Sequence, residues 1–275
     1  MTPAETYAAH LDAVQSQNSR IYGPSSGDDP WGAAARQFRF DPRRELDRNM
    51  LVIASYVQPD DIVADVGGGA GRVGLPLALQ CKEVLNIEPS PGMGAEFETL
   101  VREANISNGR LIPSSFAEVQ ELTSDIVITA DVTYFVRDIV AFIRKLEATA
   151  SRRVMITIWS EPPPNRSADF FALVYGEKQA VLPGLSQLMP VLSDMGIYPD
   201  VHEMPENPWW EDQPISIKSD AVDMLLMDRV TKPEDREHVR LLIEDNFDRL
   251  FSIGEKGFVP IWRLDMRELL ITWEI

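Results

Sequence analysis

The sequence predicts an α/β fold with a doubly wound and mostly parallel sheet. Over residues 61–162, short β-branched segments alternate with segments whose apolar residues recur at helical spacing, as in successive βαβ units. Residues 125–130 are almost continuously apolar, which is typical of a strand buried on both faces. The length of 275 residues suits one enlarged domain of this class, with additions outside the sheet.

Five strands and the helices between them are expected in this central region. The expected strands are residues 62–66, 83–87, 110–112, 125–130 and 154–159. Helices are expected from about residue 72, over 93–104 and over 136–146, because their apolar residues share one face. Strands joined in this way lie parallel, so their carboxyl ends are expected at one edge of the sheet.

The flanking segments are expected to be mainly helical. Helices are expected over residues 6–20, 42–56 and 186–195, and strands over 198–204, 258–264 and 268–273. Two more helices are expected after residue 214 and before the strand over 258–264. The second of these helices carries the capping-box pattern, Thr231 followed three residues later by Glu234.

Composition and charge narrow the class of protein. The 26 basic and 43 acidic residues give a formal net charge of −17, which repels phosphate backbones and argues against a nucleic-acid partner. No stretch approaches the ~18 apolar residues of a membrane-spanning helix, and the N-terminus lacks the pattern of a signal peptide. We therefore expect a cytoplasmic protein with a small-molecule substrate and no membrane partner, and the oligomeric state stays open.

Residues that bind metals or form disulfides are scarce. Cys81 is the single cysteine, which excludes an internal disulfide and a multi-cysteine zinc site. His10, His202 and His238 are far apart in the sequence. We interpret these four residues as ordinary surface or packing residues, and we expect no metal site.

A glycine-rich loop follows the first expected strand. Residues 65–71 read Asp-Val-Gly-Gly-Gly-Ala-Gly and join a strand to a helix. Glycine permits positive φ and lets backbone N–H groups approach a ligand, and the following helix adds its positive end. A tight turn alone accounts for one or two glycines, but not for Gly67, Gly68, Gly69 and Gly71 together. The loop therefore predicts a nucleotide or nucleoside site at the carboxyl end of the strand.

Two known ligand-binding motifs can be aligned with this loop. In the dinucleotide frame, G-x-G-x-x-G, the motif ends at Gly74, and Glu88 follows it by only 14 residues rather than about 20. In the other frame, acid-x-Gly-x-Gly-x-Gly, Asp65 is the acid and still lies in the strand. Glu88 then ends the second strand, where its carboxylate can accept two hydrogen bonds from ribose hydroxyls. No Gly-Lys-Ser/Thr follows the loop, which excludes a P-loop.

The second frame resembles the class I S-adenosylmethionine-dependent methyltransferases, over about residues 61–204. The resemblance implies a Rossmann-like fold of seven strands with an antiparallel last strand, S-adenosyl-L-methionine as cofactor, and methyl transfer as the activity. The cofactor-binding residues that it implies are Asp65, Gly67, Gly68, Gly69, Gly71, Glu88, Pro89, Ser115, Phe116 and Asp131.

The resemblance also implies a role for each of these residues. Asp65 and the glycine loop would line the methionine end, and Glu88 would bind the ribose. Ser115 and Phe116 stand where the family contacts adenine, although the acidic residue frequent there is missing. Asp131 stands where the family faces the methionine portion or the substrate. The Asn/Asp-Pro-Pro-Tyr motif of nucleic-acid amino-methyltransferases is absent after the fourth strand, where the chain reads Asp-Val-Thr-Tyr.

We divide the chain into four parts on this basis. Residues 1–58 form an N-terminal helical cap, and residues 59–206 form the Rossmann-like cofactor-binding core. Residues 207–257 form a helical insertion. Residues 258–275 supply the C-terminal strand or strands that complete the sheet.

Methyl transfer from a sulfonium is an in-line displacement that depends mainly on positioning. A general base is needed only where the acceptor must first lose a proton. The candidate catalytic residues are Asp131 and Tyr134, with Glu161 further away, and a purely structural role is an alternative for each. The acceptor and the atom methylated stay open.

Two other functions use the same loop. One is a non-catalytic protein that binds S-adenosylmethionine or S-adenosylhomocysteine, and the other is an NAD-dependent oxidoreductase. Sheet topology separates the oxidoreductase from the other two. A methyltransferase fold predicts an antiparallel last strand inserted beside the sixth, and a dinucleotide fold does not.

Two further clusters each have two interpretations. Five arginines within 13 residues form either a solvated helix face with local ion pairs or a site for a substrate carboxylate or phosphate. They are Arg36, Arg39, Arg43, Arg44 and Arg48. Four aromatic residues form either a wall around an apolar or aromatic acceptor or a packing contact. They are Trp31, Phe38, Trp209 and Trp210.

Overall fold

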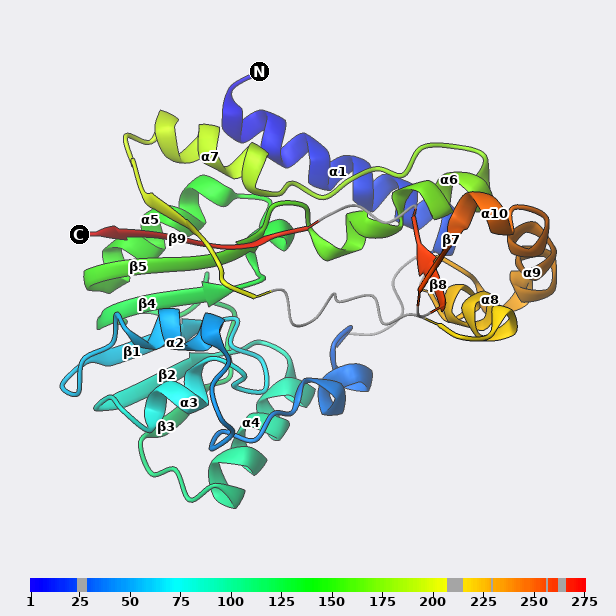
Figure 1. Cartoon of the computed structure of the whole chain (residues 1–275). Helices are drawn as coiled ribbons and strands as arrows, with labels where there is room; N and C mark the ends of the chain where they lie inside the picture. Colours follow the sequence, from blue (N-terminus) through cyan, green and yellow to red (C-terminus); the bar gives the residue numbers. More distant parts are fainter. Residues whose placement is uncertain (24–28, 207–214, 229, 256, 262–265) are drawn as a thin grey trace.

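The centre of the molecule is one twisted sheet with the order β3-β2-β1-β4-β5-β9-β6, seen in a computed structural model (Figure 1). The structure describes residues 1–23, 29–206, 215–228, 230–255, 257–261 and 266–275. The strands of this sheet are β1 (Ile62–Val66), β2 (Glu83–Ile87), β3 (Gly109–Ile112), β4 (Ser124–Ala130), β5 (Ala150–Trp159), β6 (Asp200–Glu203) and β9 (Glu268–Glu274).

The strand directions confirm the predicted fold class. Strands β1 to β5 pair in parallel, whereas β9 pairs antiparallel with both β5 and β6. The sheet therefore has seven strands, and its antiparallel last strand is inserted beside the sixth. This is the arrangement that the methyltransferase resemblance implies and that the dinucleotide frame does not.

Helices cover both faces of the sheet. The α-helices are α1 (Pro3–Tyr22), α2 (Arg48–Ala54), α3 (Gly74–Ala78), α4 (Pro91–Glu103), α5 (Ile139–Thr149), α6 (Ala168–Tyr175), α7 (Leu185–Asp194), α8 (Lys218–Leu226), α9 (Arg236–Asp245) and α10 (Phe247–Leu250). One apolar core joins α1, α5 and α7 to the sheet, and a second joins α2, α3 and α4 to it. Alternate strand residues such as Met155 and Ile156 enter opposite cores, as the two-residue period of a strand requires.

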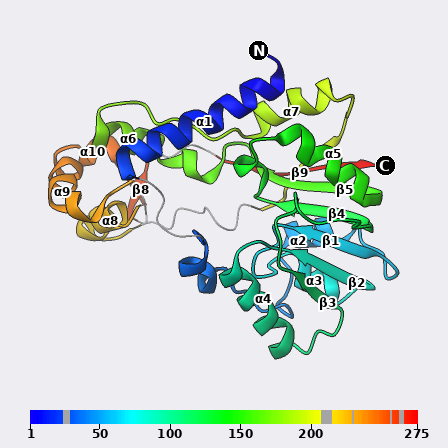
Figure 2. The ribbon, with the colours of Figure 1, turned by 180° about the vertical axis from the view of Figure 1, so that it is seen from behind.

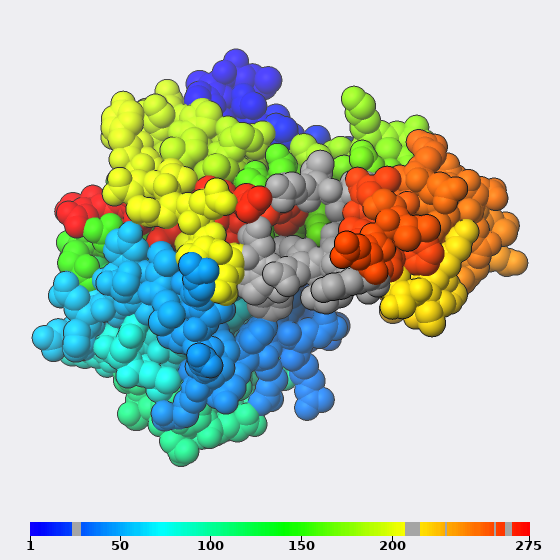
Figure 3. Space-filling model, in the orientation of Figure 1, coloured from blue at the N-terminus to red at the C-terminus, as the bar shows by residue number. Residues whose placement is uncertain are grey.

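A third apolar core lies outside the sheet. It gathers side chains of α6, α8, α9 and α10 and of a hairpin formed by β7 (Phe251–Gly254) and β8 (Gly257–Pro260). We call this group the outer lobe. It lies beyond the edge where β4 and β5 end, on the far side of the molecule from the C-terminus (Figures 1 and 2). In the space-filling view it projects away from the body that holds the sheet (Figure 3).

Helix α1 connects the outer lobe to the sheet. Tyr7, near its N-terminus, is buried in the core beside α5 and α7. Ile21, near its C-terminus, packs against the outer lobe, where the Tyr22 ring meets the Tyr175 ring edge to face at 6.1 Å. A helix of 20 residues spans about 30 Å, so one straight element reaches both parts.

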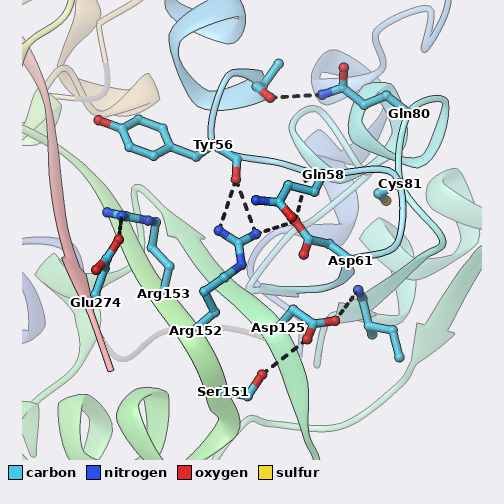
Figure 4. A network of polar contacts seen from close by, with 12 residues as sticks. Tyr56, Gln58, Asp61, Gln80, Cys81, Asp125, Ser151, Arg152, Arg153 and Glu274 are labelled. Carbon is cyan, nitrogen blue, oxygen red and sulfur yellow. Dashed lines mark hydrogen bonds and ion pairs between the residues drawn. The ribbon is translucent and has the colours of Figure 1, made fainter.

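The amino edge of the sheet carries a network of paired charges (Figure 4). Asp61 accepts hydrogen bonds from the Gln58 N–H and from the Arg152 guanidinium, which also donates to the Tyr56 carbonyl. Asp125 accepts from the Ile62 N–H at 2.8 Å through one oxygen and from the Ser151 hydroxyl at 3.2 Å through the other. Both carboxylates therefore have protein partners where the strands begin.

Several expected elements differ from the structure. The helix expected over 42–56 begins only at Arg48, because Asp47 caps it by accepting from the Met50 N–H. The helix after the glycine loop begins at Gly74 rather than at residue 72. Thr231 caps no helix, since its hydroxyl donates to the Leu225 carbonyl and α9 begins at residue 236, after the short 3-10 helix η4 (Pro233–Asp235).

The outer lobe also departs from the expected segments. Residues 258–260 lie in β8, which pairs with β7 in a separate sheet of two strands and does not complete the main sheet. Of the expected C-terminal strands, only β9 joins the main sheet. Helix α6, which follows the fifth strand closely, was not expected. None of the described helices has the length and hydropathy that a bilayer crossing needs.

Candidate functional site

The glycine loop leaves β1 at the carboxyl edge of the sheet. Gly67, Gly69 and Gly71 have φ values of 69°, 56° and 87°, in the left-handed region that glycine tolerates best. A Cβ at Gly67 would lie 2.6 Å from the Val132 side chain, and one at Gly71 would lie 2.6 Å from Leu75. A Cβ at Gly69 would meet only the Met93 sulfur, at 3.7 Å. The loop is therefore packed at both ends and open at Gly69.

Asp65 supports the loop from the inside. Its fully buried carboxyl accepts a hydrogen bond from the Gly74 N–H at 2.9 Å through Oδ2. Asp65 Oδ1 and Asn86 Oδ1, on adjacent strands in register, have no hydrogen-bond partner. Gly68 packs against both side chains, since a Cβ there would lie 2.3 Å from Asn86 Oδ1. Burial raises the pKa of Asp65 to about 7, although the Gly74 N–H lowers it.

Glu88 lies across from the open part of the loop. Its Oε2 accepts from the Gly69 N–H at 2.9 Å, and its Oε1 accepts from the Ser90 N–H at 2.7 Å, beyond Pro89. Burial raises the pKa of Glu88, and these two N–H donors oppose that rise. Each carboxylate oxygen keeps a further lone pair. Glu88 is thus held rigidly and can still accept a pair of hydroxyl groups.

Asp29, which the sequence analysis missed, reaches the same place from the N-terminal segment. Its Oδ1 accepts from the Ser90 hydroxyl at 2.8 Å, and its Oδ2 accepts from the Gly92 N–H at 3.0 Å. The Gly92 N–H and the Ser90 hydroxyl hold the pKa of Asp29 below its usual value. The sequence around Asp29 indicates only a turn, because Pro30 and Gly32 follow it closely. It does not indicate the contact with Gly92.

Residues 29–43 run along α4, and we call them the strap. They include the 3-10 helix η1 (Gly32–Phe38). Gly32 packs so tightly on Gly92 that a Cβ at Gly92 would lie 2.6 Å from the Gly32 Cα. Further along, the Arg39 guanidinium donates to both Glu96 and Glu103 of α4. The strap is therefore attached to α4 along most of its length.

The arginine cluster forms no single helix face with local ion pairs. Arg36 also approaches Glu96, at 3.8 Å, and Arg43 donates to the Ala104 carbonyl at the end of α4. Arg44 donates to the Arg72 carbonyl, and Arg48 lies 3.9 Å from a Glu206 oxygen. Most partners are thus distant in sequence, because the arginines hold the strap and α2 against the rest of the fold.

Asp131 follows β4 and is one of three non-glycine residues with positive φ in the described chain, at 61°. Its Oδ1 accepts from the Tyr134 hydroxyl at 2.6 Å, and its Oδ2 accepts from the Arg72 guanidinium at 3.0 Å. Burial and the neighbouring Asp131 raise the pKa of Tyr134, so this hydroxyl stays protonated. The structure shows Tyr134 as a hydrogen-bond donor to Asp131, and its role as a catalytic residue stays a prediction. Backbone strain of this kind gathers at functional sites.

Glu268, which the sequence analysis also missed, approaches this group from β9. Its side chain is buried, and Oε2 accepts from the Asn49 amide of α2 at 2.6 Å. Burial, followed by the charge of Asp131, raises the pKa of Glu268. Arg72 lowers it. Glu161, the third candidate base, follows β5 in a bend and is half-buried.

Ser115 and Phe116, expected at the adenine, are both engaged by protein groups. The Ser115 hydroxyl donates to Glu118 at 2.7 Å. The Phe116 ring is buried, meets the Phe142 ring edge to face at 5.7 Å, and lies beneath the Lys145 ammonium. Their assignment to adenine contacts remains a prediction.

Aromatic rings cross from the strap to the end of β4. The Trp31 ring lies 6.0 Å from Phe38 and 5.9 Å from Phe135, which in turn lies 5.7 Å from Tyr134. Trp31 and Phe135 are 43% and 50% exposed, so part of each ring is available to a ligand. Phe135 belongs to the 3-10 helix η2 (Thr133–Phe135). Trp209 and Trp210 lie outside the described residues.

No protein-family model matches the chain, and no curated protein sequence matches it. Solved structures do resemble it. The YcgJ protein of Bacillus subtilis is 14% identical, with a TM-score of 0.54, over 82% of this chain and 97% of that one. A methyltransferase of Thiobacillus denitrificans in complex with S-adenosyl-L-homocysteine is 10% identical, with a TM-score of 0.52, over 88% and 96%.

The [4+2]-cyclase SpnF is 14% identical, with a TM-score of 0.53, over 99% of this chain and 96% of that one. These identities are too low to carry over an activity or a ligand. What they share with this chain is the fold. The chain has the fold of the class I S-adenosylmethionine-dependent methyltransferases.

Proposed function

We propose that this protein is a methyltransferase that uses S-adenosyl-L-methionine to methylate a small molecule. The observation that carries the proposal is that Glu88 and the open Gly69 face each other at the carboxyl edge of this sheet. Ligands of open α/β sheets bind at that edge. The neighbour of known fold that holds S-adenosyl-L-homocysteine supports the same ligand class.

The residues at this edge fit the cofactor. The loop offers an open surface at Gly69, and the fixed Glu88 carboxylate suits the two hydroxyls of a ribose. Asp131 and Arg72 add opposite charges beside the loop. When bound, the cofactor supplies a methyl group on a sulfonium, which is already activated for transfer.

The chain's own residues then hold the acceptor and exclude water. Orientation of this kind can supply about 7–11 kcal/mol of a barrier. Asp131 is the carboxylate best placed to accept a proton or a hydrogen bond from an acceptor, because its side chain is about one-third exposed and Tyr134 fixes its orientation. Tyr134 acts through Asp131 and is a positioning residue.

Two features favour a small acceptor. The rings of Trp31 and Phe135 offer partly exposed apolar surface, and the Phe135 ring contacts Tyr134, the hydrogen-bond donor to Asp131. The net charge of −17 opposes binding to nucleic acid.

A second candidate function is binding of the cofactor without methyl transfer. One observation favours a function other than methyl transfer: the cyclase SpnF matches 99% of this chain, and cyclisation is a different reaction on the same fold. The position of β9 between β5 and β6 argues against the NAD-dependent oxidoreductase.

Calorimetric titration with S-adenosylmethionine, S-adenosylhomocysteine and NADH tests the proposal. We expect micromolar binding of the first two and no binding of NADH. Glu88→Ala should weaken binding by about 1.5–3 kcal/mol, the value of a hydrogen bond to a charged group. The matched control is Glu83→Ala, at the opposite end of the same strand, which should leave affinity unchanged.

Binding of NADH alone would overturn the proposal. Unchanged affinity in Glu88→Ala would remove the ribose assignment. Binding of the two adenosyl ligands, followed by no turnover across a panel of hydroxyl, amine and thiol acceptors, would favour the non-catalytic candidate.

A further inference from the structure

Helix α1 sends one buried side chain to the segment that follows β4. Within α1, whose residues are all described, Tyr7 alone is buried, and its side chain has no exposed surface. Its hydroxyl donates to the Thr133 carbonyl at 2.7 Å, across 126 residues of sequence. Burial raises the pKa of Tyr7, so the hydroxyl stays protonated and remains a donor. The N-terminal helix is therefore bonded directly to the backbone of η2.

Residues 131–136, which include η2, contact two other parts of the candidate site. One is the glycine loop, since a Cβ at Gly67 would lie 2.6 Å from the Val132 side chain. The other is the strap, whose Trp31 ring lies 5.9 Å from the Phe135 ring. A displacement of residues 131–136 would therefore change surfaces of the loop and of the strap that a ligand meets.

Separate contacts hold the start and the middle of this segment. At its start, Asp131 has a φ of 61°, pairs with Arg72 at 3.0 Å and donates its N–H to the Thr157 carbonyl at 3.2 Å. Two residues further on, the Tyr7 hydroxyl holds the Thr133 carbonyl. A strained backbone persists only where its surroundings hold it in place. The orientation of Asp131 therefore depends on what fixes the residues that follow it.

We propose that Tyr7 is a positioning residue of the candidate site, because its hydroxyl fixes η2 and, through η2, orients Asp131. Tyr134 and Phe135 belong to η2 and are held in the same way. Packing of α1 requires only the apolar ring of Tyr7, which a phenylalanine would supply as well, whereas the hydroxyl serves the Thr133 carbonyl. This inference rests on the proposed function, because it gives α1 a part in holding the ligand of that site.

The alternative is that the Tyr7 hydroxyl only fastens α1 to the sheet. Leu11 separates the two roles, because it lies one turn further along α1 and packs against the same apolar core. Leu11→Ala loosens α1 without removing the hydrogen bond to Thr133. If Tyr7 only fastens α1, ligand affinity follows the stability of the protein in both variants. If Tyr7 positions η2, ligand affinity follows the hydroxyl.

The experiment measures the affinity of the whole chain for S-adenosylhomocysteine by calorimetry, together with the melting temperature. In Tyr7→Phe we expect binding to weaken roughly 3- to 10-fold, the range that one neutral hydrogen bond supplies. Leu11→Ala should lower the melting temperature at least as much, because it removes packed apolar groups. It should leave the affinity unchanged.

A double-mutant cycle with Tyr134→Phe gives a second readout that a structural role of Tyr7 would not change. Both hydroxyls hold the same short helix, so either substitution alone loosens it. The double variant should therefore lose less affinity than the product of the two single effects. Two independent contacts would give that product.

Three results would each overturn this inference and leave the proposed function standing. They are an unchanged affinity in Tyr7→Phe, an equal loss of affinity in Leu11→Ala, and a double variant whose loss equals the product of the single effects. Failure of the original protein to bind S-adenosylhomocysteine would instead overturn the proposed function, and this inference with it.

Discussion

The two edges of the sheet use charged residues in opposite ways. At the amino edge, Asp61 and Asp125 each accept hydrogen bonds from protein groups on neighbouring elements (Figure 4). At the carboxyl edge, Asp65 keeps one buried oxygen without a partner, and Asp131 stands in a strained backbone conformation. Both edges carry acids, but among the described residues the buried carboxyl oxygen without a partner, Asp65 Oδ1, lies at the carboxyl edge.

The difference separates stability from binding. A charge that is paired within the protein stabilises the fold and has little left to offer a ligand. A charge that is buried and partly unsatisfied costs stability, and such groups are retained where they act on a ligand. We therefore expect variants at the amino edge to change stability alone, and variants at the carboxyl edge to change ligand binding or the pH dependence of stability.

The largest expected effect comes from Asp65, whose pKa is raised to about 7 by burial. Between about pH 4 and pH 7 the folded protein keeps this proton while the unfolded chain loses it, so stability falls as the pH rises. The loss of unfolding free energy should reach about 4 kcal/mol above pH 7, and Asp65→Asn should remove this pH dependence.

Urea unfolding at several pH values measures this effect. Asp65→Asn should be more stable than the original protein at pH 8, because the amide is neutral and adds a donor near Asn86 Oδ1. An unchanged slope in Asp65→Asn would show that the carboxyl is not the buried acid that the geometry indicates.

The second largest change in stability is expected at the amino edge. Arg152→Ala leaves the buried Asp61 carboxylate without its cation, which should cost about 2–3 kcal/mol of unfolding free energy. The affinity for S-adenosylhomocysteine should stay the same. Arg144→Ala, which breaks an exposed pair within α5, should cost only about 0.5 kcal/mol. A loss of ligand affinity in Arg152→Ala would contradict the expectation that the amino edge affects stability and not ligand binding.

The smallest effect is expected for Tyr134→Phe. The variant removes the hydroxyl that holds Asp131 and should cost about 1–2 kcal/mol of stability. Binding of S-adenosylhomocysteine should also weaken, because Asp131 loses one anchor. Calorimetry and urea unfolding of the same samples measure both quantities, and an unchanged affinity for S-adenosylhomocysteine would contradict a positioning role.

Much of the fold and part of the site were predictable from local pattern. β-Branched runs predicted the five central strands, and four glycines within five residues predicted a ligand loop after β1. The position of Glu88 followed from the strand that it ends. These features depend on the conformational preferences of short segments, which a single sequence displays directly.

The missed residues depend on contacts between distant segments. Asp29 meets Gly92 across 63 residues, and Asn49 meets Glu268 across 219 residues. The sequence suggested that the arginine cluster lies on one helix face. Its partners in α4, Glu96 and Glu103, could not be recognised, because they are remote in the sequence. The spacing of residues within a short segment does not indicate which distant residue it will contact.

By itself the sequence determined the class of fold, the glycine loop and the acid at the end of the second strand, because spacing and residue type set periodicity and backbone freedom locally. The tertiary structure alone decided that Asp65 lies behind the loop, that Tyr134 serves Asp131, and that β8 pairs outside the main sheet. Arg72 and Asp131, 59 residues apart, become a pair only because the sheet order places β4 beside β1.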